Sequence, residues 1–194
     1  MKRAFDIVVS AISLVLLAPV LLAIGAWVSW GSPGGAFFRQ IRVGRGGRPF
    51  LLLKFRTMRA NTEQQGQLTA GEGDPRVTAQ GRVLRRTKLD ELPQLLNVLR
   101  GDMSLVGPRP EVPRYVELYT PEQQQVLSVR PGMTGAASLE FIDEQKLLGA
   151  VTDPERTYVE EIMPGKLELE LRYIREQSLF GDLCILIRTV GRLI

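Results

Sequence analysis

The sequence of 194 residues contains no histidine and only one cysteine, Cys184. The absence of histidine excludes a Ser-His-Asp triad, a histidine general base and a histidine-ligated zinc site. A single cysteine excludes a disulfide framework and a metal site built from several thiolates. Any catalysis by this chain therefore depends on carboxylates, Lys, Arg, Tyr, Ser or Thr.

Acidic residues are scarce in the first third of the chain, where Asp6 is followed by no other until Glu63. From Arg39 to Lys88 there are 12 basic residues and three acidic ones. Such a basic region is typical of surfaces that bind the phosphates of nucleotides, nucleic acids or anionic lipids. A solvated charged surface without a ligand is the alternative interpretation.

One long apolar run stands out, the 24 residues from Ile7 to Trp30, which carry no charge. A helix of this length measures about 36 Å, whereas the hydrocarbon core of a bilayer is roughly 30 Å thick. Lys2 and Arg3 precede the run, and Trp27 lies where aromatic residues meet the membrane interface. A cleaved signal peptide would have a shorter apolar segment. The run therefore predicts a membrane-embedded helix.

Pro19 lies in the middle of this run and removes one helical hydrogen bond. It is compatible with an ordinary kinked span, because prolines are tolerated in spanning helices. It is equally compatible with a helix that breaks and returns to the same face of the membrane. Basic residues on both flanks, at Lys2 and Arg3 and again from Arg39 to Arg48, favour the second arrangement under the positive-inside rule.

The remaining sequence combines a short β-region with many helical patterns, and we expect an α+β fold that is mainly helical. Residues 37–43 and 50–58 read as strands joined by the glycine-rich residues 44–49, which predicts a β-hairpin. Residues 61–81 are polar and predict a surface loop. Residues 178–194 predict an amphipathic helix that either packs on the core or lies in the membrane interface.

A further helix is predicted to begin near Asp90, with Pro93 in its first turn and Gly101 as its stop signal. Its apolar face is formed by Leu92, Leu95, Leu96 and Leu99. Asp90 and Glu91 would then lie at the positive end of the helix dipole, which favours ionised carboxylates with low pKa values. A simple helix cap is the structural alternative.

The basic neighbours of this carboxylate pair suggest chemistry rather than capping alone. Two ionised carboxylates can hold a divalent metal ion while Arg85, Arg86 and Lys88 hold phosphate oxygens. A carboxylate can also act as the nucleophile of phosphoryl transfer and form an acyl phosphate. This reaction needs no general base, which suits a chain without histidine.

Two arginines lie in rigid turns farther along the chain. Arg109 is held between Pro108 and Pro110, and Arg130 precedes a Pro-Gly pair. A guanidinium fixed in this way can bind a phosphate bidentately, although a purely structural turn is the alternative.

Four motifs, 54–58, 90–94, 104–110 and 130–135, occur in the order found in bacterial sugar transferases. Over nearly its whole length, the chain resembles the small monotopic phosphoglycosyl transferases of that family. The resemblance implies transfer of a sugar phosphate from a UDP-sugar to a polyprenol phosphate such as undecaprenyl phosphate, with release of UMP. The implied location is the cytoplasmic face of the bacterial inner membrane.

The resemblance also implies roles for individual residues. Asp90 would be the nucleophile and Glu91 its partner, with Mg²⁺ held by this pair. It implies that the N-terminal helix, residues 1–31, is re-entrant with a break at Pro19, and that residues 32–194 form a cytoplasmic catalytic domain. Charge and position in the family make five residues candidate ligands of the substrate phosphates: Lys54, Arg56, Arg85, Arg109 and Arg130.

The resemblance also implies membrane lipids as partners and implies no role for nucleic acid. The embedded helix and the amphipathic helix at residues 178–194 could together support a homodimer. The chain departs from the family pattern at residues 136–141, which we expect to face the sugar. Two other classes of function remain open. One is a membrane-anchored adaptor that binds anionic lipid or nucleic acid, and the other is a single-span enzyme of phospholipid head-group transfer.

Overall fold

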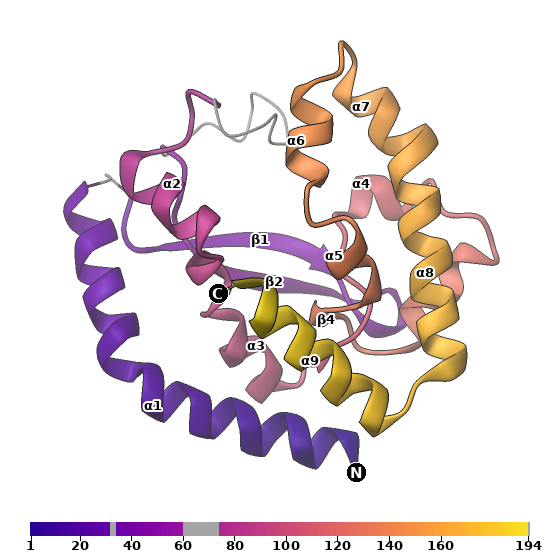
Figure 1. Cartoon of the computed structure of the whole chain (residues 1–194), viewed down its shortest axis with the longest axis horizontal. Helices are drawn as coiled ribbons and strands as arrows, with labels where there is room; N and C mark the ends of the chain where they lie inside the picture. The colour runs from indigo at the N-terminus through magenta and orange to yellow at the C-terminus, as the bar shows by residue number, and fades with distance from the viewer. Residues whose placement is uncertain (32–33, 60–73, 194) are drawn as a thin grey trace.

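A computed structural model describes residues 1–31, 34–59 and 74–193 of the chain. The predicted class is confirmed, because the fold is mainly helical with two small sheets (Figure 1). The strands are β1 (Phe37–Val43), β2 (Pro49–Phe55), β3 (Ser104–Val106) and β4 (Gly132–Thr134). The α-helices are α1 (Lys2–Gly31), α2 (Ala79–Arg86), α3 (Gln94–Arg100), α4 (Pro113–Val116), α5 (Ala136–Glu140), α6 (Glu144–Gly149), α7 (Pro154–Thr157), α8 (Met163–Glu176) and α9 (Leu179–Leu193). Shorter helical turns are η1 (Arg45–Gly47), η3 (Leu89–Glu91), η4 (Gln123–Ser128) and η5 (Tyr158–Ile162).

The predicted hairpin is confirmed, and β1 pairs with β2 in antiparallel register from Phe37 opposite Phe55 to Val43 opposite Pro49. The second strand ends at Phe55 rather than Met58. The connection adopts positive φ values at Gly46 and Gly47, which side chains rarely tolerate. The glycine-rich linker is therefore what closes this turn.

A second, parallel pair joins β3 to β4 and was not foreseen from the sequence. It brings together the two segments that carry Arg109 and Arg130. The backbones approach so closely that a Cβ on Gly132 would lie 2.1 Å from the amide nitrogen of Gly107. Glycine at this position is a steric requirement of the pairing.

Helix α1 runs without interruption through Pro19, so the break predicted there is absent, and Figure 1 shows that the helix is bent along its course. Proline removes a single backbone hydrogen bond, and the helix continues on either side of it. Helix α1 is long and apolar enough to cross a membrane by length and composition, and only 11% of its most apolar 18-residue window is buried within the protein.

The N-terminal half of α1 is tied to the globular body by polar contacts. Lys2 forms an ion pair with Asp182 at the start of α9. The Asp6 carboxylate is buried and accepts hydrogen bonds from the Ser104 hydroxyl at 2.9 Å and the Leu105 amide at 3.2 Å. The Arg3 guanidinium donates to carbonyls in the last turn of α3.

The C-terminal half of α1 is held by apolar packing. Ile24 and Val28 are buried together with Phe55 of β2 and Leu84 of α2. Both halves of the helix therefore contact the same globular body.

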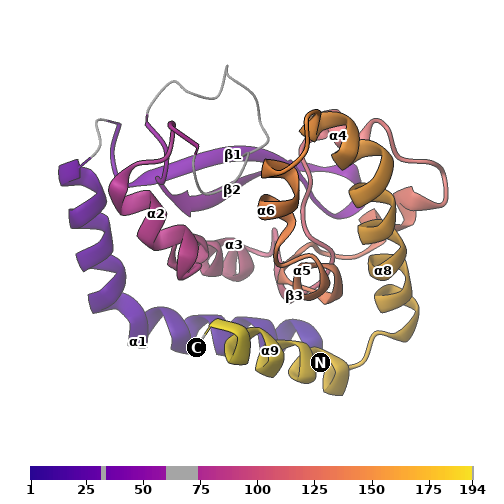
Figure 2. The same ribbon diagram turned by 45° about the horizontal axis from the view of Figure 1, so that its top comes forward.

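Helix α9 packs on the core, which is the first of the two interpretations given for residues 178–194, and its place in a membrane interface stays a prediction. Ile185 and Leu186 pack on the core cluster formed by β2, α3 and β3. The remaining apolar side chains are exposed: Leu179, Phe180, Leu183, Ile187 and Val190. Figures 1 and 2 show α9 beside the N-terminal half of α1.

The loop predicted over residues 61–81 is wrong at its end, because α2 begins at Ala79. The Thr78 hydroxyl caps the helix by accepting a hydrogen bond from the Gly81 amide at 3.0 Å. This cap falls inside the stretch whose polar composition suggested a loop. Residues 60–73 lie outside the described part of the chain.

The helix expected to start near Asp90 begins as the short turn η3 and continues as α3 from Gln94. Gly101 ends it in the left-handed conformation, as predicted. The predicted apolar face is partly wrong, because Leu96 is exposed while Asn97 is fully buried. The Asn97 side chain bonds to the amide of Leu53 and the carbonyl of Leu51, so α3 presents an amide to the backbone of β2.

Candidate active site

A cavity of about 630 Å³ lies between the β1–β2 hairpin and the helices that follow it. One wall carries the predicted carboxylates together with four basic side chains. These six residues are Lys54, Arg85, Lys88, Asp90, Glu91 and Arg109. Side chains from β2, α2, η3 and the turn after β3 thus converge on one space, which we call the basic wall.

A strained turn places the carboxylates in this cavity. In the described part of the chain, Lys88 is the only non-glycine residue with a positive φ, at 56°. A left-handed conformation costs an L-residue about 1 kcal/mol, so it persists only where the surroundings impose it. Here it separates α2 from η3 and directs the chain so that Asp90 and Glu91 both line the cavity.

Asp90 is buried, with only 6% of its surface exposed. Among the described residues its Oδ1 atom has no hydrogen-bond partner. Burial raises the pKa of Asp90, Lys54 opposes this, and the neighbouring Glu91 adds to it. The prediction of a low pKa at this position is therefore wrong. The dipole of a three-residue turn does not offset the loss of hydration.

Glu91 experiences the opposite balance. Its Oε1 atom accepts hydrogen bonds from Lys54 Nζ at 2.7 Å and from Arg109 Nη2 at 2.9 Å. Burial by itself would raise the pKa of Glu91, but Arg109 and Lys54 hold it well below its ordinary value. The pKa values of two adjacent carboxyl groups are thus shifted in opposite directions, an arrangement typical of catalytic pairs.

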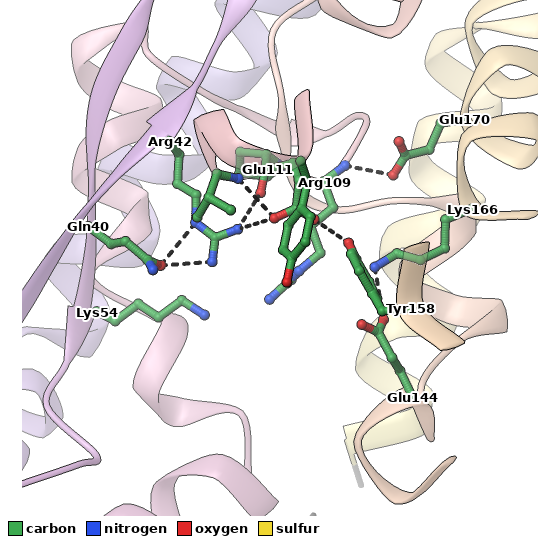
Figure 3. Close-up of polar contacts among 12 residues, drawn as sticks. Gln40, Arg42, Lys54, Arg109, Glu111, Glu144, Tyr158, Lys166 and Glu170 are labelled. Atoms are coloured by element: carbon green, nitrogen blue, oxygen red, sulfur yellow. Dashed lines mark hydrogen bonds and ion pairs between the residues drawn. The ribbon is translucent and has the colours of Figure 1, made fainter. Parts of the chain in front are cut away.

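The turn that carries Arg109 is fixed from two sides (Figure 3). The Arg109 amide donates to Glu170 Oε1 on α8 at 2.8 Å. The Arg42 guanidinium on β1 donates to the Pro110 carbonyl at 3.0 Å and to Glu111 Oε1 at 2.9 Å. These contacts hold the backbone on both sides of the guanidinium that reaches Glu91.

The other predicted phosphate ligands differ in position. Arg85 lines the cavity and its Nε donates to the Thr57 hydroxyl at 2.9 Å. Arg56 also lines it, but its guanidinium donates to backbone carbonyls of residues 34, 35 and 37. Arg130 is not among the described residues that line the cavity, and its Nε donates to the Gly101 carbonyl at the end of α3.

The opposite end of the cavity was missed by the sequence analysis. It is lined by side chains of α4, α6, η5 and α8, namely Tyr115, Glu144, Leu148, Tyr158 and Lys166. Tyr158 lies in a π-helical turn, which has no recognisable sequence signal. We call these five residues the α6 end.

Residues 136–141, expected to face the sugar, do not line the cavity in the described structure. They form α5 and the residue that follows it, and α5 packs against α8 and α9. Residues Glu144 and Leu148, on the next helix along the chain, reach the cavity instead.

The carboxylate pair was also predicted to hold Mg²⁺. No cluster of three or more carboxylate or thiol side chains that could hold a metal occurs within the described ranges. Mg²⁺ at phosphoryl-transfer sites is commonly bound by one or two carboxylates together with substrate phosphates and water. The unpartnered Oδ1 of Asp90, adjacent to ionised Glu91, fits a site of that kind.

Comparison with known proteins gives a match to the family model for bacterial sugar transferases over residues 1–194. The UDP-glucose:undecaprenyl-phosphate glucose-1-phosphate transferase of Caulobacter vibrioides is 43% identical over 100% of this chain and 69% of its own length. The UDP-N-acetylgalactosamine-undecaprenyl-phosphate N-acetylgalactosaminephosphotransferase of Aeromonas hydrophila is 40% identical over 97% of this chain. This chain spans only 42% of the Aeromonas protein. The exopolysaccharide production protein ExoY of Rhizobium meliloti is 35% identical over 97% of this chain and 83% of its own length.

Proposed function

Because the chain belongs to the bacterial sugar transferase family, we propose that it transfers a sugar-1-phosphate from a UDP-sugar to undecaprenyl phosphate and releases UMP. The observation that carries this proposal is the carboxylate pair of buried Asp90 and partly buried Glu91 in a cavity whose basic wall is otherwise cationic. Such a wall complements a diphosphate, and the names of the relatives state the same two classes of substrate for those proteins.

Binding of the donor places its diphosphate against Lys54, Arg85, Lys88 and Arg109. Lys54 and Arg109 are paired with Glu91 before the donor arrives, so they are already oriented toward the site. Positioning and charge neutralisation are the main contributions of a protein to phosphoryl transfer. Mg²⁺, when bound by Asp90, Glu91 and the phosphates, would add neutralisation of the transferring group.

Asp90 then acts as the nucleophile. Its carboxylate attacks as the anion, a form that burial disfavours and that the neighbouring Lys54 ammonium stabilises. A carboxylate oxygen forms a bond to the β-phosphorus, and the bond from that phosphorus to the oxygen bridging it to the α-phosphate breaks. The electron pair of that bond leaves with UMP, whose charge is stabilised by the basic wall.

The second step transfers the sugar phosphate from Asp90 to the lipid. A phosphate oxygen of undecaprenyl phosphate attacks the phosphorus of the acyl phosphate and releases the Asp90 carboxylate. The product is a lipid-linked diphosphate sugar, and the enzyme returns to its starting state. UMP therefore leaves before the acceptor reacts, as in a ping-pong mechanism.

Helices α1 and α9 are proposed to hold the site at the cytoplasmic face of the bacterial inner membrane. The bend in α1 and the contacts of both its halves with one globular body support a re-entrant helix rather than a span. Helix α9 lies beside the first half of α1 (Figure 2), and its exposed apolar side chains suit an interfacial helix. The adaptor hypothesis is not favoured, because phosphate binding alone needs no pair of carboxylates within the basic wall.

The test is release of UMP from a panel of UDP-sugars by detergent-solubilised protein with Mg²⁺ and undecaprenyl phosphate. We expect turnover with at least one donor, and a loss of about 10³-fold or more in Asp90→Asn. Asp143→Asn makes the same chemical change at an exposed residue and serves as the control. Turnover of Asp90→Asn at the wild-type rate would contradict the proposed mechanism.

A further inference from the structure

The two ends of the cavity differ in charge. The basic wall has an excess of positive charge, because it contains two carboxylates and four basic side chains, Lys54, Arg85, Lys88 and Arg109. At the α6 end each charge has a partner, since Lys166 Nζ donates to Glu144 Oε2 at 2.8 Å. The Tyr158 hydroxyl donates to Glu111, which also receives Arg42. The diphosphate therefore belongs at the basic wall, and a neutral part of the donor belongs at the α6 end.

A UDP-sugar has two neutral parts, the uridine and the hexose. Recognition of a base commonly uses an open aromatic face on which the base stacks. Both aromatic rings at the α6 end are already engaged. The Lys166 ammonium lies 5.3 Å from the Tyr158 ring centre, and the Arg114 guanidinium lies 5.5 Å from the Tyr115 ring centre. The two rings also contact each other, with centres 4.9 Å apart and planes inclined by 55°.

Hydrogen-bonding groups remain at this end. Lys166 is 7% exposed and is held by Glu144, whose second carboxylate oxygen points away from it in Figure 3. Within the described ranges, Lys166 is the only side chain bonded to Glu144. A sugar hydroxyl both donates and accepts, so an adjacent carboxylate and ammonium suit neighbouring hydroxyls of a hexose.

The position of Glu144 is fixed by packing one turn farther along α6. Leu148 is 2% exposed and lies in the core cluster that contains Tyr158, Ile162 and Leu167. The short helix is thereby anchored beside η5 and α8, and Glu144 is held at the cavity surface. A contact fixed in this way can discriminate between epimers, because a displaced hydroxyl leaves a partly buried carboxylate unpaired.

From these observations we infer that the α6 end holds the hexose of the donor and that Glu144, oriented by Lys166, selects it. This inference rests on the proposed function, because it assumes a UDP-sugar in the cavity. It assigns the uridine to the remaining part of the cavity.

The inference is tested by direct binding of UDP-sugar and UMP, measured by calorimetry with Mg²⁺ in an Asp90→Asn background that prevents turnover. The donor is the preferred sugar of the panel, or UDP-glucose if no donor is turned over. We expect Glu144→Gln to weaken binding of the UDP-sugar about tenfold, the effect of losing one charge-assisted hydrogen bond. Binding of UMP, which has no sugar, should stay unchanged and also reports that the variant is folded. Glu122→Gln, an exposed substitution of the same kind, is the control.

Two results would overturn the inference. Weakening of UMP binding as large as that of UDP-sugar binding would mean that Glu144 does not act through the sugar. Unchanged binding of both would remove Glu144 from the donor site. The two proposals are tested separately. Failure of the wild-type protein to release UMP from any donor would contradict the proposed transfer reaction. The effect of Glu144→Gln on UDP-sugar binding relative to UMP binding tests the inference about the hexose.

Discussion

Asp90 and Glu91 are adjacent in sequence and both belong to the basic wall, yet they have different electrostatic surroundings. Glu91 forms ion pairs with Lys54 and Arg109. Asp90 has a buried oxygen that has no hydrogen-bond partner among the described residues, and burial raises its pKa. One carboxylate therefore organises the cations, and the other is left available to react.

Glu170 illustrates how a buried group can position the backbone of a residue that lines the cavity. It accepts the Arg109 amide, and burial raises its pKa to about 7 although the Arg109 amide and Lys166 oppose this. The nearby Glu111 carboxylate raises the pKa of Glu170 further, and the Tyr119 hydroxyl is a second titratable group close enough to interact with Glu170. Between about pH 4.5 and 7 the folded protein retains a proton that the unfolded chain has released. The free energy of unfolding therefore decreases as the pH rises through this range.

Glu170→Gln keeps an oxygen that can accept the Arg109 amide but removes the titration. We expect the thermal midpoint of the variant, relative to wild type, to increase from about pH 5 to about pH 8. The corresponding change in unfolding free energy is on the order of 3 kcal/mol. Thermal unfolding in detergent at several pH values measures this, with Glu122→Gln as the exposed control. A difference between variant and wild type that does not vary with pH would be inconsistent with a neutral, buried Glu170.

At the scale of elements, the hairpin and the long apolar helix were predictable because each follows from a pattern within a short stretch of sequence. The β3–β4 pair was not, because its three-residue strands are held together by the close approach of Gly107 and Gly132. The same limit applies to the site. Asp90, Glu91 and Arg109 were found through local motifs, whereas Tyr158 and Lys166 reach the cavity only because η5 and α8 fold over it.

Burial is the second property that local sequence did not reveal. The pattern around residue 90 indicated a helix start and hence a low pKa for Asp90. In the folded chain, burial of Asp90 raises its pKa although Lys54 of β2 opposes this, and neither effect can be read from the residues next to Asp90. Arg130 was predicted to bind phosphate because it lies in a rigid turn, but its guanidinium instead donates to the Gly101 carbonyl at the end of α3.

The contacts of α1 predict on which side of the membrane its two flanks lie. Because both its halves contact the same body, we expect its two flanks on one side of the membrane. A cysteine added before Met1 and Arg48→Cys, each in a Cys184→Ser background, report the two flanks. An impermeant maleimide should label both in inside-out vesicles and neither in right-side-out vesicles. Labelling of the two flanks from opposite sides would show a single span.

At the scale of the whole molecule, the proposed function explains why a basic cavity and apolar helices occur in one chain. The hairpin and η3 contribute to the basic cavity, and α1 and α9 present exposed apolar side chains. In the proposed reaction, a polyprenol would keep its tail in the membrane while its phosphate reaches Asp90. The unusual composition of the chain follows from this division, with a charge-free N-terminal run followed by a strongly basic segment.

The most direct test of the central claim is the intact mass of the protein after incubation with the preferred UDP-sugar and Mg²⁺ in the absence of acceptor. We predict an increase by one sugar phosphate, together with release of UMP. The increase should disappear on addition of undecaprenyl phosphate and should be absent in Asp90→Asn. An unchanged mass, with UMP released only when the acceptor is present, would contradict a covalent intermediate on Asp90.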